Sequence, residues 1–499
     1  MRFTKSIKII FGIIISAVAL SSCTKEADTR SIEEREKISL EAWIKLNKPE
    51  LLNNYQEEGG YYVEILDEGP IENESASGND FGTEPLMEQD TCWVYTNMTG
   101  RDINGTICLT RDGDLADLCG TFSYSTHYAP YFNYCGNTNM GLLEGSYLAM
   151  RHELKIGDKT YKMRKGSKVR LYLPSSIAYG KNGSNTQGGY EGQYALNASR
   201  PLVLDIDVLG AIKDPSLREE EMVNSYKGYA GNEAWMQATK PESEKTDEND
   251  DLKLKGLYYN LQFNPKTDNN QIYIKPEEVG TQNPYSDDKV YTSMANLDKQ
   301  INEILAKRFG EGLTKEQLTD DNKVTLGGRA NVWYIVRFLD GFVVDTNIAE
   351  IRTLVFKEDA PECEAFSYSP SDDEGKAQSE RQTIGAWYYC IPQMHYGAYG
   401  QILTTSGYAY GISGLSGTTT TTQTSTSGSS SYYDALNYYN YYNYYNSYYD
   451  YYSPYYNYYD YNYYDYSASE QDVVTTKTIS TEVLPYTPLV FTLYVEPYE

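Results

Sequence analysis

The pattern of hydrophobic and polar residues predicts a helix at the start of the chain and strands in most of the remaining sequence. Ser31-Ile-Glu-Glu34 forms a capping box, acidic residues occupy the next turn, lysines come later, and Pro49 ends the pattern, so a helix is expected in the region 23–54. The later segments alternate apolar and polar residues or are rich in β-branched and aromatic residues, which favours strands.

A second helical pattern interrupts the strands at about residues 284–330. Five apolar residues recur there at the spacing of one helical face, namely Leu297, Ile301, Ile304, Leu305 and Phe309. Gly310 comes next and favours a helix end, and the capping box Thr314-Lys-Glu-Gln317 predicts a further short helix. Residues 214–255 read as a helix and a charged linker.

The same order of segments occurs twice along the chain. Residues 41–50 (EAWIKLNKPE) return as residues 233–242 (EAWMQATKPE), with six of ten positions identical. "GYYVEIL" is matched by "GLYYNLQF", and "RPLVLDIDVLG" by "TPLVFTLYVEP", in the same order. We therefore expect two copies of one α+β unit, at residues 55–213 and 256–499.

The N-terminus has the features of an export signal. Arg2, Lys5 and Lys8 precede an apolar run at residues 9–20, which is too short to span a bilayer. The adjoining Leu-Ser-Ser-Cys23 resembles the signal of a bacterial (Bacteroidetes-like) lipoprotein, in which residues 1–22 are removed and Cys23 carries acyl chains such as palmitate. This resemblance implies lipid anchoring to the outer membrane of the cell envelope, on its periplasmic face or at the cell surface.

Charge and composition exclude several classes of function. The chain has a net charge of −27, and residues 1–22 contribute three positive charges to it, so nucleic acid is not an expected partner. Its three histidines are far apart and none of its cysteines forms a CxxC pair, so neither a metal site nor a cofactor is expected. Export permits disulfides, and four cysteines lie in residues 92–135, but the sequence leaves their pairing open.

The second copy resembles FKBP-type peptidyl-prolyl cis-trans isomerases. The resemblance rests on "VRFLDGFVVDTN", "IGAWYYCIPQMHYG", "LTTSGYAYG" and "PLVFTLYVE", which stand in the family's order. The spacing from Met394 to Tyr410 recurs between Met163 and Tyr179, so both copies resemble the family. The resemblance implies two FKBP-like domains, each a twisted antiparallel sheet wrapped on a short helix. It also implies a folding helper for proline-containing extracytoplasmic polypeptides.

The resemblance assigns roles to nine residues of the second copy. Trp387 would floor the proline pocket, while the Ile384 main-chain N–H and the Tyr410 hydroxyl would donate to substrate carbonyl groups. Tyr334 and Asp345 would complete the set of catalytic residues. The expected substrate-binding residues are Val344, Leu354, Phe356 and Phe491. Val344 and Leu354 depart from the aromatic residues usual in the family. An alternative role for Asp345 is to cap a turn.

The first copy departs further from the family. It has Met98 where the second copy has Tyr334, and Leu109 in place of Asp345. Cys108 stands in place of Val344 and Leu204 in place of Phe491, while Tyr179 is retained. Either Ser146 or Ile156 falls at the tryptophan position. The first copy is therefore expected to keep the fold without the pocket, as a spacer, a binding module or a chaperone-like surface.

A low-complexity loop at about residues 412–483 separates the last two motifs of the second copy. It contains a Gly/Ser/Thr-rich stretch and then 20 of the chain's 52 tyrosines, between Tyr432 and Tyr466. Tyrosine offers a large amphipathic contact area. The alternative hypothesis for the whole protein is therefore a non-catalytic binding module whose tyrosine-rich loop contacts a protein or a glycan. Replication slippage in a tolerant loop explains the run equally well.

Overall fold

The computed structural model describes residues 30–498 except 71–77, 137–141, 185–195, 231–233, 246–250, 267–287, 326, 358–363, 371–382, 417–418, 425–473 and 480. The expected signal segment 1–22, Cys23 and the tyrosine run 432–466 lie outside the described residues. We refer to residues 30–213 as the first half and to residues 214–498 as the second half.

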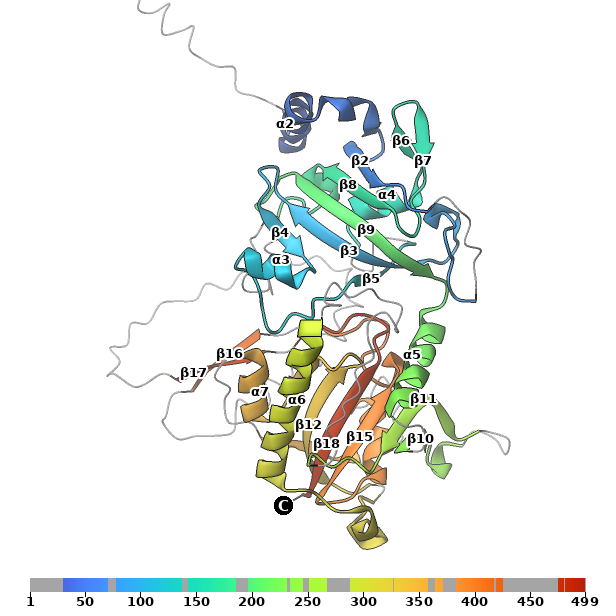
Figure 1. The fold of residues 1–499 in the computed structure, drawn as a ribbon, viewed down its shortest axis with the longest axis vertical. Helices are drawn as coiled ribbons and strands as arrows, with labels where there is room; N and C mark the ends of the chain where they lie inside the picture. Colours follow the sequence, from blue (N-terminus) through green and yellow to red (C-terminus); the bar gives the residue numbers. More distant parts are fainter. Residues whose placement is uncertain are drawn as a thin grey trace, which may run out of the picture.

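Each half is built on a seven-stranded antiparallel sheet, and the two sheets have the same strand order (Figure 1). The first has the order β1-β2-β8-β9-β3-β4 with β5 beside β3, and the second has β10-β11-β15-β18-β12-β13 with β14 beside β12. Because strands, order and direction all recur, the structure agrees with the predicted repeat of one α+β unit.

The strands of the first sheet are β1 (Tyr55–Gln56), β2 (Tyr61–Asp67), β3 (Trp93–Arg101), β4 (Ile107–Thr110), β5 (Tyr131–Tyr134), β8 (Lys168–Leu173) and β9 (Leu202–Ile212). Those of the second sheet are β10 (Met236–Thr239), β11 (Lys253–Asn260), β12 (Ala330–Phe338), β13 (Val343–Thr346), β14 (Phe366–Tyr368), β15 (Ala398–Thr404) and β18 (Leu489–Pro497). The α-helices are α2 (Ile32–Asn47), α3 (Gly113–Leu118), α4 (Glu144–Arg151), α5 (Pro215–Ala230), α6 (Asp288–Phe309), α7 (Ala349–Phe356) and α8 (Gly385–Cys390). A small hairpin joins β6 (Leu154–Ile156) to β7 (Lys159–Tyr161).

Strand register confirms the residue-by-residue alignment of the two halves. Gly100 on β3 pairs with both Leu204 on β9 and Leu109 on β4. Val336 has the corresponding position on β12, and it pairs with both Phe491 on β18 and Asp345 on β13. A register irregularity occurs at the same place in both pairs, immediately after this position. Leu109 therefore stands where the second half has Asp345, as the sequence predicts.

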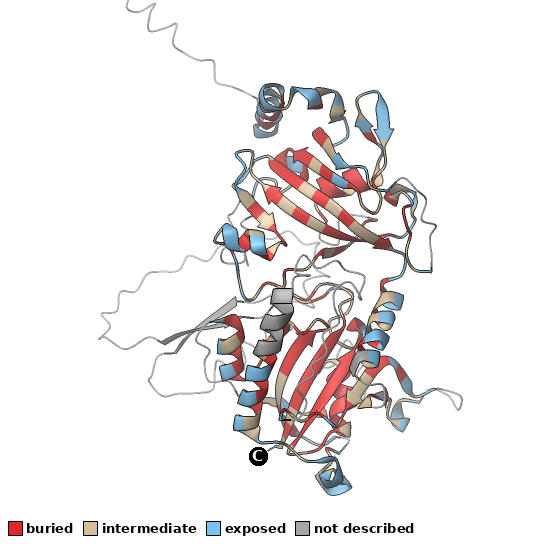
Figure 2. Ribbon diagram, viewed as in Figure 1, coloured by how far each residue is buried: buried red, intermediate tan, exposed pale blue. Residues whose placement is uncertain are grey.

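The second sheet is covered on both faces, whereas the first is covered fully on one. All seven residues of β15 are buried, while β9 alternates between buried and half-buried residues over most of its length. Figure 2 shows this difference as banded strands in the first half and nearly continuous burial in the second. In each half one face packs on a short helix, α4 or α8. The other face of the second sheet lies under α5 and α6 (Figure 1).

The inserted helix α6 accounts for the extra coverage. Ile301 and Leu305 are almost fully buried against Ile335 on β12, and α6 ends at Gly310, which has a left-handed conformation (φ 78°). The predicted apolar face of α6 is therefore confirmed. At the corresponding face of the first sheet, Arg101 and Arg170 both pair with Asp205. On this face of the first sheet, charged side chains therefore occupy the place that α6 takes on the second sheet.

The connection between the halves contributes to the second sheet. Residues 214–255 hold α5 and also β10, which pairs with β11, so this stretch is more than a helix and a linker. Within the segment 233–242, which matches the sequence of a helix, Met236–Thr239 form an edge strand. Trp43 and Trp235 nevertheless pack on the same face of their sheets, against Val203 and its counterpart Val490. Tertiary packing on this edge outweighs the local sequence similarity.

The described ends of the low-complexity loop form a two-stranded ribbon. β16 (Thr419–Thr424) pairs with β17 (Val474–Ile479), and Leu415 bridges to Val483 at the base. The ribbon lies beside α7 in Figure 1. The segment that carries the tyrosine run thus starts and ends at the tip of this ribbon.

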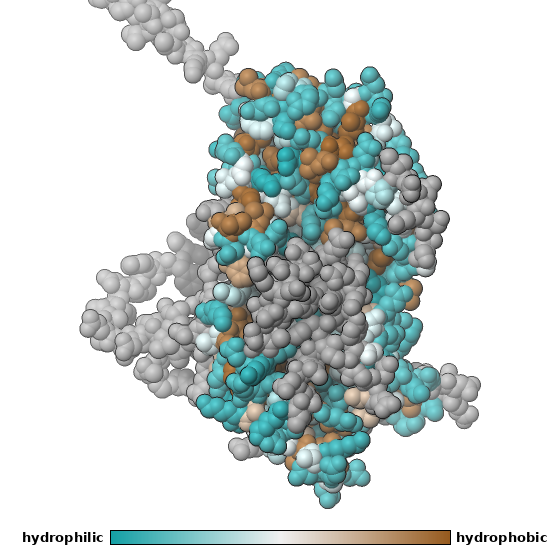
Figure 3. Space-filling model, viewed as in Figure 1, coloured by the Kyte–Doolittle hydropathy of each residue, from teal (hydrophilic) through white to brown (hydrophobic). Residues whose placement is uncertain are grey.

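The described surface is largely hydrophilic in the view of Figure 3, with apolar residues in small groups. None of the helices in the described part of the chain is both long enough and apolar enough to cross a membrane.

Candidate functional site

An aromatic cluster in the second half surrounds Trp387 on α8. Every residue of this short helix is buried, and Trp387 is 6% exposed. Its indole makes edge-on contacts with Tyr334, Phe366 and Phe491, with ring centroids 5.3, 5.0 and 6.0 Å away. Edge-to-face packing is the favourable geometry for aromatic rings in a core. The floor is made of aromatic and aliphatic side chains, and the indole Nε1 is a buried donor without a partner among the described residues.

A chain of hydrogen bonds crosses one wall of this cluster. The Tyr334 hydroxyl donates to Asp345 Oδ2 at 2.9 Å, and Arg352 Nη2 donates to Asp345 Oδ1 at 3.0 Å. Burial raises the pKa of Asp345, which the Arg352 charge and the Tyr334 hydrogen bond oppose. Burial and the Asp345 charge also raise the pKa of Tyr334. Tyr334 therefore remains a protonated donor, and the carboxylate is fixed from both sides.

Ile384 and Tyr410 lie at the border of the same cluster and are half-buried. Ile384 is the N-cap of α8, so its own N–H has no acceptor within the helix. Tyr410 comes just after a 3₁₀ turn at Ser406–Tyr408, which Glu219 of α5 holds in place. The Ser406 N–H and Oγ both donate to the Glu219 carboxylate, at 2.7 and 2.8 Å. α5 thus positions the turn that presents Tyr410.

Seven of the nine residues predicted for the site come together around Trp387: Tyr334, Val344, Asp345, Ile384, Trp387, Tyr410 and Phe491. Leu354 and Phe356 do not, and this expectation is wrong in the structure. Both lie on α7 and pack toward α6, in the cluster that contains Ile301. α7 presents this face to α6 because the inserted helix supplies an apolar partner there. Phe366, on the short strand β14, contacts Trp387 instead.

Sequence reasoning missed Arg352 and Phe366. Arg352 lies one turn inside α7, seven residues after Asp345, and its side chain is buried. A buried arginine requires an acid nearby, so the Asp345–Arg352 spacing was the available signal. β14 has only three residues, which is too short for a strand pattern to stand out.

The base of the ribbon adjoins the site. The Thr481 N–H donates to the Val344 carbonyl oxygen at 3.0 Å, and Val483 is buried in the Trp387 cluster. Val344 and Asp345 are neighbours on β13. The low-complexity loop therefore returns to the sheet beside the candidate site.

The first half lacks the site. Leu143 is the N-cap of α4 as Ile384 is of α8, so Ser146 occupies the position of Trp387. This resolves the alternatives in favour of Ser146, which is fully buried. Leu109 replaces the carboxylate, and Tyr179 is retained after an equivalent 3₁₀ turn. Neither an aromatic floor nor a fixed acid is present at this position.

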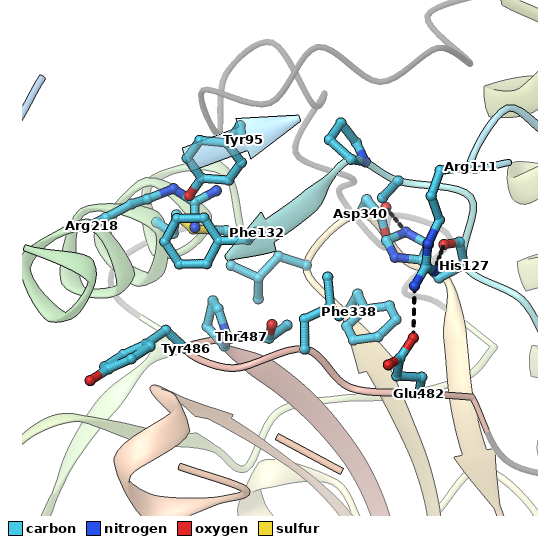
Figure 4. A pocket seen from close by; sticks show the side chains of 16 residues that line it. Tyr95, Arg111, His127, Phe132, Arg218, Phe338, Asp340, Glu482, Tyr486 and Thr487 are labelled. Atoms are coloured by element: carbon cyan, nitrogen blue, oxygen red, sulfur yellow. Dashed lines mark hydrogen bonds and ion pairs between the residues drawn. The ribbon is translucent and has the colours of Figure 1, made fainter. Parts of the chain in front are cut away.

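A cavity of about 100 Å³, partly open to solvent, lies between the two halves (Figure 4). Two charged contacts cross it: Arg111 Nη2 lies 2.7 Å from Glu482 Oε2, and His127 Nε2 lies 2.6 Å from Asp340 Oδ2. The Arg218 guanidinium stacks over the ring of Tyr95 on its other side. This cavity results from the packing of the two halves and shares Phe338 with the Trp387 cluster.

Comparison with known proteins gives weak matches. No protein-family model and no curated protein sequence matches the chain. Among solved structures, the three FKBP domains of wheat FKBP73 match over 89% of this chain and 96% of that one, with 12% identity and a TM-score of 0.20. FkpA from Escherichia coli matches over 42% and 72%, with 17% identity and a TM-score of 0.22. A peptidyl-prolyl cis-trans isomerase from Pseudomonas syringae matches over 37% and 98%, with 16% identity and a TM-score of 0.22. At these scores the overlaps carry no conclusion about activity.

Proposed function

We propose that the second half binds prolyl peptides at the Trp387 cluster and catalyses their cis–trans isomerisation. The observation that carries the proposal is the combination of an apolar aromatic floor with a wall in which Asp345 is fixed by Tyr334 and Arg352. The resemblance of the sequence to FKBP-type isomerases supports the same assignment.

The chemistry needs no nucleophile. Rotation about a peptide bond meets a barrier of about 18–20 kcal/mol because resonance keeps it planar. The twisted state has lost that resonance and is less polar than the planar amide. A dry aromatic surface such as Trp387 with Phe366 and Phe491 therefore favours the twisted state over the planar one.

Donors at the border of the cluster hold the substrate chain. In this proposal the Ile384 N–H and the Tyr410 hydroxyl donate to carbonyl groups on either side of the proline, as the resemblance to the family implies. Asp345 presents a fixed negative charge toward the rotating carbonyl carbon, and Arg352 keeps it in place. No bond to the substrate forms or breaks, so the site only binds, orients and excludes water.

A refolding assay tests this function. A protein whose refolding is limited by an X-Pro bond should refold faster with catalytic amounts of the full chain, since prolyl isomerisation takes tens to hundreds of seconds uncatalysed. A macrolide that fills aromatic prolyl sites should abolish the acceleration. Unchanged refolding in the presence of folded protein would refute catalysis.

A binding module without catalysis is the second candidate, because the base of the ribbon contacts Val344 beside the site. In this case the tyrosine run would grip a protein or a glycan. β16 and β17 pair in register up to Thr424 and Val474, so residues 425–473 can be replaced by Asn-Gly, which favours a tight hairpin turn. Loss of partner binding in this deletion, with binding intact in Trp387→Leu, would favour the binding module.

We also propose that the protein is exported and anchored in the cell envelope by acyl chains on Cys23. The apolar run 9–20 and the adjoining Leu-Ser-Ser-Cys support this. Metabolic labelling with a fatty acid should mark the wild-type chain and leave Cys23→Ser unlabelled; equal labelling of both would contradict it.

A further inference from the structure

Two cysteines of the first half face each other across neighbouring strands. Trp93 on β3 pairs with Tyr134 on β5, and the next pair in this register is Cys92 and Cys135. The Cys135 N–H donates to the Cys92 carbonyl oxygen at 2.8 Å, so the antiparallel pairing continues through both residues. Both are free thiols in this structure and fully buried.

The geometry of this pair suits a disulfide. Directly opposite residues of antiparallel strands have Cα atoms about 4.5–5.5 Å apart, and disulfides span Cα separations of about 4.4–6.8 Å. Both side chains point into the same core cluster, and the Cys135 thiol also donates to Met150 Sδ at 3.7 Å. Cys108 lies on β4 and Cys119 ends α3, so they belong to other elements.

We infer that Cys92 and Cys135 form a disulfide when the chain folds under oxidising conditions. The oxidant is another disulfide, either a small-molecule disulfide or the active-site disulfide of a thiol oxidase. One cysteine thiolate attacks the oxidant's S–S bond and releases one thiol; the second cysteine then attacks the mixed disulfide and releases the other. The two cysteines lose two protons and two electrons, which the oxidant's two sulfurs receive.

The folded state controls when this reaction occurs. The hydrogen bond to Cys135 and burial raise the pKa of the Cys92 thiol well above its usual range, so the folded protein holds little Cys92 thiolate. Oxidation therefore takes place while β3 and β5 come together, before the core closes. The bridge fixes both ends of the segment that carries β4, α3 and His127, which contacts the second half.

The test uses the full chain and is independent of the proposed isomerase activity. Protein unfolded in denaturant and reductant is refolded in a mixture of oxidised and reduced glutathione, then unfolded again with a thiol-blocking reagent and digested. We expect a linked pair of peptides containing Cys92 and Cys135, with a mass about 2 Da below the sum of the two reduced peptides. Native reduced protein exposed to the same mixture should link more slowly.

Matched variants complete the test. Cys135→Ala should abolish the linked peptide and Cys108→Ala should retain it. Reductant should lower the thermal midpoint of refolded wild-type protein and leave that of Cys135→Ala unchanged. Complete blocking of Cys92 and Cys135 after oxidative refolding, or a link from either residue to another cysteine, would overturn the inference.

Discussion

Asp345 is the residue on which the candidate site depends, because it joins β13 to two other elements. Tyr334 on β12 and Arg352 on α7 each donate to one of its carboxylate oxygens. The turn-capping role that the sequence left open for Asp345 has a counterpart here too, since the Thr346 backbone also hydrogen-bonds its carboxylate. The sequence placed Tyr334 and Asp345 correctly and missed Arg352, because an ion pair between a strand and the next helix leaves no periodic pattern.

Removal of Arg352 should be costly. Its side chain is 7% exposed and that of Asp345 is 27% exposed, so Arg352→Met leaves a largely buried carboxylate without its positive partner, with the Tyr334 hydroxyl still donating to it. Breaking a buried pair in this way costs about 3–5 kcal/mol of unfolding free energy. Urea unfolding measures this loss of unfolding free energy. Lys266→Met is the control, because Lys266 pairs with Glu311 at the surface and its substitution should cost less than about 1 kcal/mol. Equal effects in the two variants would contradict the structural role of the pair.

The ionisation of Glu219 should make the stability of the protein depend on pH, and a mutation at this residue should isolate that contribution. Burial raises the pKa of Glu219, although Ser406 hydrogen bonds oppose this. The folded state therefore keeps its proton at a pH where the unfolded state, with a pKa of about 4.3, has lost it. This contribution to stability is fully present below about pH 4.3 and is lost as the pH rises through the folded pKa.

The comparison of Glu219→Gln with wild type tests that sign. As the pH rises from about 4 to about 7, the unfolding free energy of wild type should fall by more than that of the variant. Glu221→Gln, at an exposed position two residues further along α5, is the control and should behave like wild type. A variant that loses more stability than wild type over this range would show that the pKa of Glu219 is lowered by folding.

At the scale of elements, the sequence predicted what depends on local pattern. The capping box at Ser31 and the apolar face of α6 are both present, and the strand order recurs as the repeat implied. The prediction from sequence failed where tertiary packing determines the structure. Met236–Thr239, within the matched segment 233–242, form the edge strand β10 because α5 already covers that end of the sheet. Phe356 turns toward α6 because the insert offers it an apolar surface.

The contact between α6 and the second sheet should contribute strongly to stability. Leu305 is 2% exposed and packs in the cluster of Ile335 and Tyr399. Leu305→Ala should lower the unfolding free energy by about 2–5 kcal/mol through lost burial and the cavity left behind. Leu217→Ala on α5, where the side chain is 42% exposed, is the control. A loss below about 1 kcal/mol for Leu305→Ala would show that α6 is only loosely attached.

At the scale of the whole molecule, the first half contacts the strands that carry the site. His127 lies against Phe338 and Phe342, on either side of the turn between β12 and β13, with ring centroids 4.4 and 4.9 Å away. Arg111 pairs with Glu482, next to the residue whose N–H bonds Val344. The first half, which has neither the aromatic floor nor the fixed acid, is therefore placed to stabilise the site of the second. The sequence left its role open, because contacts between the halves have no local pattern.

Weakening this interface should separate the halves. The double variant Arg111→Met, His127→Gln removes both charged contacts, and we expect it to unfold in two thermal transitions where wild type unfolds in one. His152→Gln is the control, since His152 pairs with Glu58 inside the first half. A single transition at an unchanged midpoint in the double variant would contradict a coupling between the halves.

Acid should weaken the same interface. Burial alone would raise the pKa of Asp340, but His127 and hydrogen bonds from the backbone bring it below the usual value. Its contribution is therefore present above an unfolded pKa of about 3.9 and is lost as the pH falls through the lower folded value. Calorimetry at decreasing pH should show the two halves separating over that range in wild type, and Asp340→Asn should lack this component.

Exchange NMR on a short X-Pro peptide tests the central claim most directly. With wild-type protein, the cis–trans exchange rate of the peptide should rise well above its uncatalysed value. With Trp387→Leu the acceleration should fall by at least about tenfold, which corresponds to about 1.4 kcal/mol of the barrier. Trp235→Leu, a buried tryptophan on the opposite face of the same sheet, should keep it. Acceleration absent from folded wild-type protein, or retained in full by Trp387→Leu, would contradict a prolyl isomerase built on this site.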